Sequence, residues 1–248
     1  NKQSVDDNKN DGINTINQVQ AFVTTKANAR NEITQAADQR KATFPNDNNA
    51  TTEEKEEASN NVDAIVAASN EQINQAKTDA AVNQIKDQTI QEINQVTPAN
   101  TKKETALANI KTKQDQQTYI INNEPNATAE EKEAALQALT QAVTTANDEI
   151  NAATTNAQVE TAVQNGETNI SNVIPQTQTK TNAKNEVDQA AANQNAAIEQ
   201  NQDATTEEKD AAKQLVARTQ NNENQAIVNA ENAADVETKK NEGINSIG

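Results

Sequence analysis

The sequence predicts an all-α protein of tandem three-helix bundles joined end to end into an elongated rod. One motif, Thr-x-Glu-Glu-Lys, recurs at a fixed period, because its first Glu stands at positions 53, 130 and 207, 77 residues apart each time. A fixed period of this kind is typical of a repeated supersecondary unit. Between the motifs, apolar residues recur at spacings of three and four, which indicates amphipathic helices.

Each motif predicts the start of a helix. Thr51 is the expected N-cap, and Glu54, three residues later, is expected to bond back to the cap N–H in a capping box. The same roles fall to Thr128 with Glu131 and to Thr205 with Glu208. Loop-forming residues such as those at 45–49 come just before, so a turn should precede each cap.

The apolar stripes indicate three helices in each period. The expected repeats are 1–78, 79–155 and 156–232, with 233–248 as the first helix of a truncated fourth repeat. Residues 153–157 contain neither Gly nor Pro, so we expect the helix to continue, or nearly continue, across this junction. A short break with a new Thr or Asn cap is the alternative. The pattern leaves open which three successive helices form one compact bundle.

A glycine recurs in one column of the repeat. Gly12, Gly166 and Gly243 share this column, and Thr89 replaces glycine in the second copy. Glycine inside a helix costs about 1 kcal/mol relative to alanine. Its recurrence therefore indicates a close helix crossing or a kink, and a frayed helix is the alternative.

The amino-acid composition argues against most catalytic mechanisms. The chain has no Cys and no His, so it lacks thiol nucleophiles, disulfides and the commonest general base and metal ligand. Only four Gly are present, and no glycine-rich phosphate loop is found. Acids near Asp47 resemble a calcium loop but lack its glycine and spacing, and the capping box accounts for Glu54. We expect no enzyme activity, no catalytic residue, no metal site and no cofactor.

The net charge and the hydropathy of the chain argue against binding to nucleic acid and against insertion into a bilayer. A formal net charge of -16 and a pI near 4.4 argue against nucleic acid, which binds clustered cations. No apolar run approaches the ~20 residues that cross a bilayer, so no membrane insertion is expected in this stretch. The chain has no Met and starts in mid-pattern at Asn1, so we expect a piece of a longer protein whose export signal and anchor lie outside it. We also expect this piece to be a monomer.

One cluster is a candidate contact patch. Tyr119 is the only Tyr of the chain, and Ile120 and Ile121 follow it. Tyr is favoured at protein-binding hot spots. The alternative is that the cluster forms core at the end of a helix. Because Tyr119 aligns with Ala42 and Ala196, such a patch would belong to one copy alone.

The combined register resembles a known family. Thr-x-Glu-Glu-Lys before an apolar helix, Ile-Asn-Gln-Ala at 73–76 and Gly-Ile-Asn-Ser-Ile at 243–247 are similar to the 77-residue helical repeats of unknown function in giant staphylococcal cell-surface proteins of the extracellular-matrix-binding type. Glu167, where Ile is usual, and Thr89, where Gly is usual, depart from that pattern. The resemblance implies an extracellular, cell-wall-associated string of bundles with roles in adhesion, host-matrix attachment and envelope integrity.

Three hypotheses of function follow. The first is a non-enzymatic spacer or stalk in a bacterial cell-surface adhesin. The second is a module that binds host extracellular matrix, with fibronectin as the ligand that the resemblance implies. The third is an intracellular helical scaffold, which a parent protein without export signal or anchor would favour.

Overall fold

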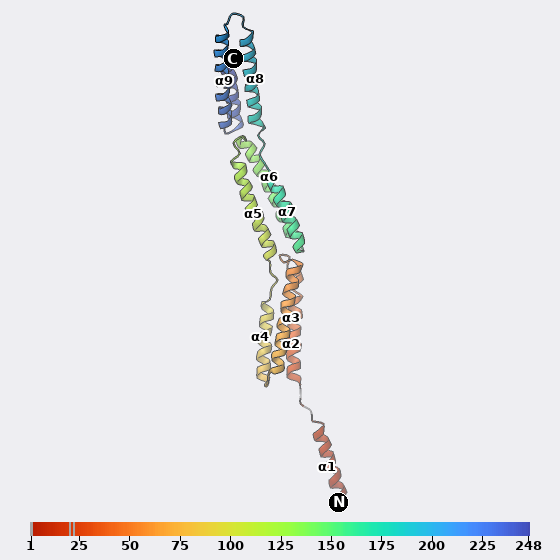
Figure 1. Cartoon of the computed structure of the whole chain (residues 1–248). Helices are drawn as coiled ribbons and strands as arrows, with labels where there is room; N and C mark the ends of the chain where they lie inside the picture. The colour runs from red at the N-terminus through yellow and green to blue at the C-terminus, as the bar shows by residue number, and fades with distance from the viewer. Residues whose placement is uncertain (1, 20, 22) are drawn as a thin grey trace. The chain divides into compact units, whose positions relative to one another are not determined.

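The computed structural model describes residues 2–19, 21 and 23–248. These residues form ten α-helices and one short 3-10 helix, and they include no strand, which confirms the all-α prediction. In chain order the elements are α1 (Lys2–Asn17), α2 (Thr24–Lys41), η1 (Phe44–Asn46), α3 (Thr52–Gln75), α4 (Asp79–Gln95), α5 (Thr101–Asn122), α6 (Ala129–Ala152), α7 (Asn156–Ser171), α8 (Gln178–Gln200), α9 (Thr206–Asn229) and α10 (Ala233–Ile247) (Figure 1).

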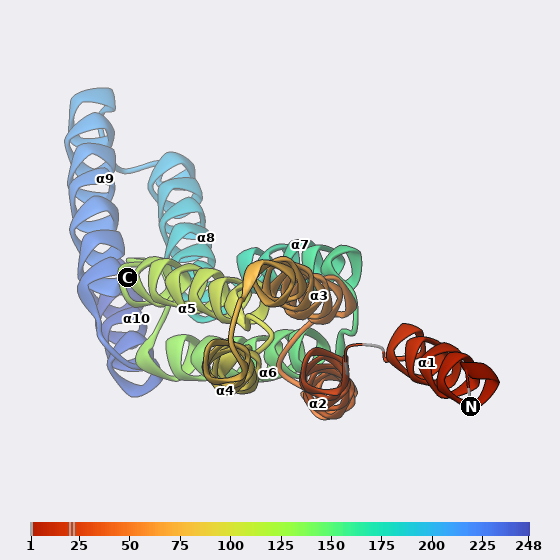
Figure 2. The ribbon, with the colours of Figure 1, turned by 90° about the horizontal axis from the view of Figure 1, so that it is seen from below.

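The helices after α1 pack in threes. In the first compact unit, Asn1–Asn100, helices α2, α3 and α4 contact one another and form bundle 1, which Figure 2 shows nearly end-on. The second unit, Thr101–Gly248, contains bundle 2 (α5, α6 and α7) and bundle 3 (α8, α9 and α10). The prediction of tandem three-helix bundles is therefore confirmed.

The bundles are offset from the divisions expected at 78/79, 155/156 and 232/233. Each of these positions falls between the second and third helix of a bundle, at α3/α4, α6/α7 and α9/α10. The short link at each position turns the chain so that the third helix packs back on the other two. Residues 233–248, expected to open a fourth repeat, instead supply the third helix of bundle 3.

The helix does not continue through residues 153–157, so that expectation was wrong. α6 ends at Ala152, and Ala153 has an extended backbone with φ -61° and ψ 138°. Thr155 then caps α7 in a box with Gln158, whose side-chain oxygen accepts from the backbone N–H groups of Thr154 and Thr155. This local network satisfies the new helix start, so a break is stable without Gly or Pro.

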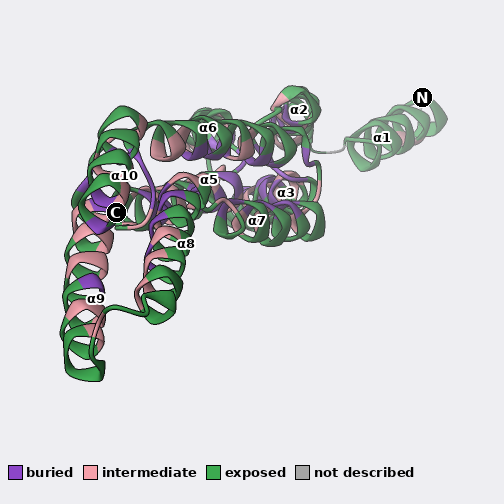
Figure 3. Cartoon of the chain, turned by 90° about the horizontal axis from the view of Figure 1, so that it is seen from above, coloured by how far each residue is buried: buried purple, intermediate pink, exposed green. Residues whose placement is uncertain are grey.

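Each core is thin and repeats the same columns. The deepest side chains come from one column in each helix of a bundle, and Figure 3 shows the buried residues along the inner faces. These columns are Ile33, Ile110 and Val187; Ile73, Ile150 and Ile227; and Ile93, Ile170 and Ile247. Burying one such side chain contributes roughly 1.5–3 kcal/mol, so a few columns account for much of each bundle's cohesion.

The glycine column marks close helix crossings in bundles 2 and 3. A Cβ placed on Gly166 would lie 2.6 Å from the Cβ of Ala146 on α6, and one placed on Gly243 would lie 2.8 Å from the Cβ of Glu223 on α9. Side-chain carbons do not approach this closely, so glycine lets the helix backbones come together. Gly12 on α1 has nothing within 4 Å of the same position.

We predict opposite effects for two glycine-to-alanine substitutions. Gly166→Ala should lower the free energy of unfolding of bundle 2 by about 2 kcal/mol, because an approach of 2.6 Å puts the overpacking cost near the upper end of roughly 1–3 kcal/mol, and the gain in helix propensity is only about 1 kcal/mol. Gly12→Ala should leave bundle 2 unchanged and increase the helicity of α1. Urea titration followed by residue-resolved NMR measures both, and an unchanged midpoint for Gly166→Ala would contradict the close crossing.

Candidate functional site: the joint between bundles 2 and 3

The start of α6 carries a complete capping box. The Thr128 Oγ1 accepts from the backbone N–H of Glu131 at 3.3 Å, and the Glu131 Oε2 accepts from the backbone N–H of Thr128 at 2.9 Å. Thr51 with Glu54 forms the same pair of bonds at α3, and Thr205 with Glu208 forms it at α9. The box satisfies two N–H groups that a helix start otherwise leaves without a partner.

The carboxylate of Glu131 also binds the next bundle. Its second oxygen, Oε1, accepts from the backbone N–H of Thr179 at 3.0 Å and from the Thr179 hydroxyl at 2.9 Å. Thr179 lies in the first turn of α8. One side chain therefore holds the start of a helix in bundle 2 and the start of a helix in bundle 3.

The first turn of α6 makes two further bonds to bundle 3. The backbone N–H of Ala129 donates to the carbonyl oxygen of Glu231 at 2.8 Å, and the backbone N–H of Ala233 donates to Glu130 Oε2 at 3.1 Å. Glu231 and Ala233 lie at the link between α9 and α10. The start of α6 thus engages two separate parts of bundle 3.

A buried lysine completes the joint. Lys180 is only 3% exposed, and its Nζ donates to the carbonyl of Pro125 in bundle 2 at 2.8 Å and to the carbonyl of Val228 in bundle 3 at 2.7 Å. Val228 lies in the last turn of α9, where carbonyls lack helical partners and where the helix dipole favours a cation. We call Glu130, Glu131, Thr179, Lys180 and Ala233 the joint residues.

The lysine position recurs in every bundle. Lys26 Nζ donates to the carbonyl of Asn74 at 2.8 Å, and Lys103 Nζ donates to the carbonyl of Asn151 at 2.7 Å. In each case the acceptor lies near the end of the bundle's second helix. The lysine column therefore ties the start of the first helix to the end of the second, and Lys180 shows that it can also reach a neighbouring bundle.

The electrostatics of the joint favour the ionised acids. Partial burial raises the pKa of Glu131, but the hydrogen bonds from Thr128 and Thr179 outweigh it, and the pKa lies below its ordinary value. The backbone N–H of Glu130 itself, followed by that of Ala233, lowers the pKa of Glu130. Burial is the main cause that lowers the pKa of Lys180, and the nearby Lys132 acts in the same direction.

The expected contact patch divides between surface and core. Tyr119 and Ile120 are 69% and 52% exposed, whereas Ile121 is fully buried in bundle 2. The alternative that the cluster is core therefore holds only for Ile121.

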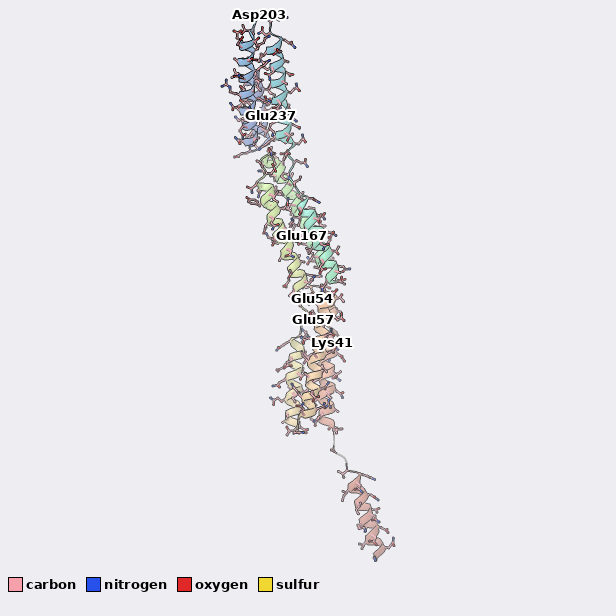
Figure 4. The ribbon with its side chains drawn as sticks, viewed as in Figure 1. Lys41, Glu54, Glu57, Glu167, Asp203 and Glu237 are labelled. Atoms are coloured by element: carbon pink, nitrogen blue, oxygen red, sulfur yellow. The ribbon has the colours of Figure 1, made fainter. Side chains whose placement is uncertain are left out.

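The cap residues of α9, Thr205 and Glu208, are exposed. They follow the turn that contains Asp203, labelled in Figure 4, at the end of bundle 3 away from the joint.

The joint residues were not singled out from the sequence, apart from Glu131 as a cap. Their partners are mostly backbone N–H and carbonyl groups, which carry no sequence signature. The one usable signal was the recurrence of Lys26, Lys103 and Lys180 in the 77-residue register. Conversely, no group of three or more Asp, Glu, His or Cys side chains that could hold a metal occurs in the described part of the chain.

The fold and the joint define a tandem helical-repeat protein in which bundles 2 and 3 are coupled by hydrogen bonds between neighbouring helix ends. The chain belongs to the family described as Domain of Unknown Function (DUF1542), which matches residues 25–101, 102–178 and 179–248. These three segments coincide with bundles 1, 2 and 3. Comparison with curated proteins and with solved structures gives no match. Among the helices described, none has both the length and the apolar character to span a bilayer.

We predict that the joint weakens in acid. Because the pKa of Glu131 is depressed in the folded chain, its contribution is complete above the ordinary value of 4.5 and is lost as the pH falls through the lower folded value. The amide resonance of Thr179, followed by NMR between pH 7 and pH 3, should therefore shift with the protonation of Glu131.

Two variants test the assignment of that titration. Glu131→Gln should abolish the acid shift at Thr179, whereas Glu208→Gln, which alters the equivalent cap of α9, should leave it in place. If the Thr179 amide titrates equally in Glu131→Gln, the shared carboxylate is not the cause.

Proposed function

We propose that the chain is a non-enzymatic structural spacer, one stretch of the stalk of a bacterial cell-surface adhesin at the cell wall. The observation that carries this proposal is the joint, in which Glu131 and Lys180 each bind groups from two bundles. A spacer needs modules that keep their mutual orientation under load, and such shared contacts provide it between bundles 2 and 3.

The energetics of the joint support a stiff connection. A typical hydrogen bond contributes about 0.5–1.5 kcal/mol net, and bonds to charged groups contribute more. Bending at the joint would break several bonds at once and would leave buried Lys180 with fewer acceptors, which is costly for a buried charge. A flexible hinge would instead be expected to have few bonds across it.

The extracellular setting is part of the proposal. The family likeness to repeats of staphylococcal surface proteins supports it, as does the polar, acidic surface with a net charge of -16, which favours solubility of a long repeat array. Repetition of the same module adds length without requiring a new fold. No catalytic role, cofactor or nucleic-acid partner is proposed.

We predict a single, narrow distance between bundles 2 and 3. The chain has no Cys, so spin labels can be attached at Gln141→Cys on α6 and Gln214→Cys on α9, both exposed. Pulsed electron resonance should give one narrow distance distribution. Lys180→Met combined with Glu131→Gln should broaden it while the helicity is retained.

The matched control is Lys26→Met, which removes the equivalent lysine contact within bundle 1. It should leave the distance distribution unchanged, because Lys26 makes no bond in the joint. A broad distribution in the unaltered chain would show a flexible connection and would remove the main support for a spacer.

A second candidate is a module that binds host matrix, with fibronectin as the ligand to test. The exposure of Tyr119 and Ile120 on α5 favours it, because an aromatic and an aliphatic side chain are available side by side in the chain.

We predict that, if this second function holds, the full chain binds fibronectin saturably in a calorimetric titration. Tyr119→Ala with Ile120→Ser should weaken binding by about tenfold or more, as expected for a hot-spot residue. Leu215→Ser, which removes another exposed apolar side chain, serves as the control. An absence of saturable binding would eliminate this candidate and leave the spacer proposal untouched.

A further inference from the structure

A groove of about 350 Å³ lies on bundle 1 between α3 and α4, which pack against each other (Figure 1). This volume is near the lower end of the range for sites that bind small ligands, roughly 300–1,000 Å³. Its polar lining consists of Ser69 and Gln72 from α3 and of Gln88, Thr89 and Glu92 from α4. Polar groups from two helices therefore converge on one groove.

The groove lies where bundle 1 departs from the repeat. Thr89 stands in the column in which Gly166 and Gly243 permit the close crossings of bundles 2 and 3. Ser69 stands in the column of Ala146, whose side chain approaches Gly166. Bundle 1 therefore has two hydroxyl side chains at the level where bundle 2 has a glycine against an alanine.

The hydroxyl of Thr89 lacks the bond that a helical threonine usually makes. Thr112, Thr140 and Thr161 each donate to the carbonyl oxygen four residues earlier. Thr89 is only 4% exposed, and its hydroxyl makes neither that bond nor another hydrogen bond within the described part of the chain. Because a buried hydroxyl without a partner is costly, this group indicates a partner that enters from the groove.

The neighbouring polar groups are also available. Glu92 lies three residues after Thr89, on the same face of α4. Its exposed carboxylate makes no ion pair or hydrogen bond with any residue that the structure describes, and the same holds for the side-chain amides of Gln72 and Gln88. The groove therefore presents a free negative charge beside a free hydroxyl.

The available atoms are mostly hydrogen-bond acceptors. The Ser69 hydroxyl donates to the carbonyl of Val66 at 2.8 Å, so its oxygen can only accept from a ligand. The carboxylate of Glu92 likewise only accepts, and it repels anions, as does the net charge of -16. An ammonium group fits these conditions, because it has a positive charge, three donors and no acceptor.

We propose that this groove binds a primary alkylammonium group, as carried by a free diamine or by the lysine side chain of a peptide. The ammonium donates to Glu92 and to the hydroxyl oxygens of Thr89 and Ser69. The alkyl stem lies along the apolar wall that α3 contributes, formed by Ala64, Ile65 and Ala68. This site is independent of the joint and of the spacer role.

An NMR titration of the isotope-labelled full chain tests the site. Cadaverine represents the free diamine, and Nα-acetyl-lysine methylamide represents the lysine side chain. We expect saturable shifts at the amides of Ser69 and Thr89 with at least one probe, and the probe that binds more tightly identifies the source of the ammonium. The pentanediol of the same length as cadaverine, which has no charge, should bind at least about tenfold more weakly.

Substitutions in the groove assign the binding. Glu92→Gln should raise the dissociation constant about tenfold, and Thr89→Val, which keeps the shape but removes the hydroxyl, about fivefold. Thr89→Ser should stay within about twofold, because it retains the hydroxyl. The matched control is Glu71→Gln, which removes an exposed carboxylate of α3 that does not line the groove and should leave the affinity unchanged.

Three results would each overturn the proposal. They are the absence of saturable shifts with both amines, an unchanged affinity in Thr89→Val and Glu92→Gln, and binding of the diol as tight as that of cadaverine. The second result would mean that the amines are attracted by the net charge of the chain instead of by this groove.

Discussion

The burial of a few isoleucine and valine columns between three helices is the interaction on which the structure depends. Ile110, Ile150 and Ile170 meet in bundle 2, and their counterparts meet in bundles 1 and 3. The rest of each core is largely alanine and valine, so the helices must come close to exclude water. Glycine at 166 and 243 permits that approach at the tightest crossing. Because these core side chains are small, the stability of each bundle depends more on how closely the helix backbones approach than on the volume of the side chains.

The capping boxes connect this internal packing to the coupling of modules. A Thr-x-x-Glu start sets where the second helix of a bundle begins, and it leaves one carboxylate oxygen of Glu131 available for the next bundle. The buried ammonium of Lys180 contributes from the opposite direction, at the end of α9. Because Glu131 belongs to both the cap of α6 and the joint, the residue that helps to start this helix also helps to fix the orientation of bundle 2 relative to bundle 3.

The predictable features were those decided within a few residues. The apolar spacing around Ile110 and Ile150 indicates helices, and Thr128 with Glu131 indicates a helix start, because both partners lie within one turn. The sequence did not predict which three successive helices form one bundle. The links at 76–78 and 153–155 contain no Gly or Pro, and the cap residues that break the helix there resemble ordinary helical residues. The joint depends on backbone groups of Pro125 and Val228, which have no sequence signature, although the lysine column was a visible clue.

Native-state amide hydrogen exchange of the whole chain tests the central claim most directly. The account predicts the slowest exchange at the repeated core positions 33, 110 and 187, in three separate sets, with the unpaired helix α1 exchanging rapidly. Slow exchange in α1 with the bundles unprotected, or uniformly fast exchange along the chain, would contradict it.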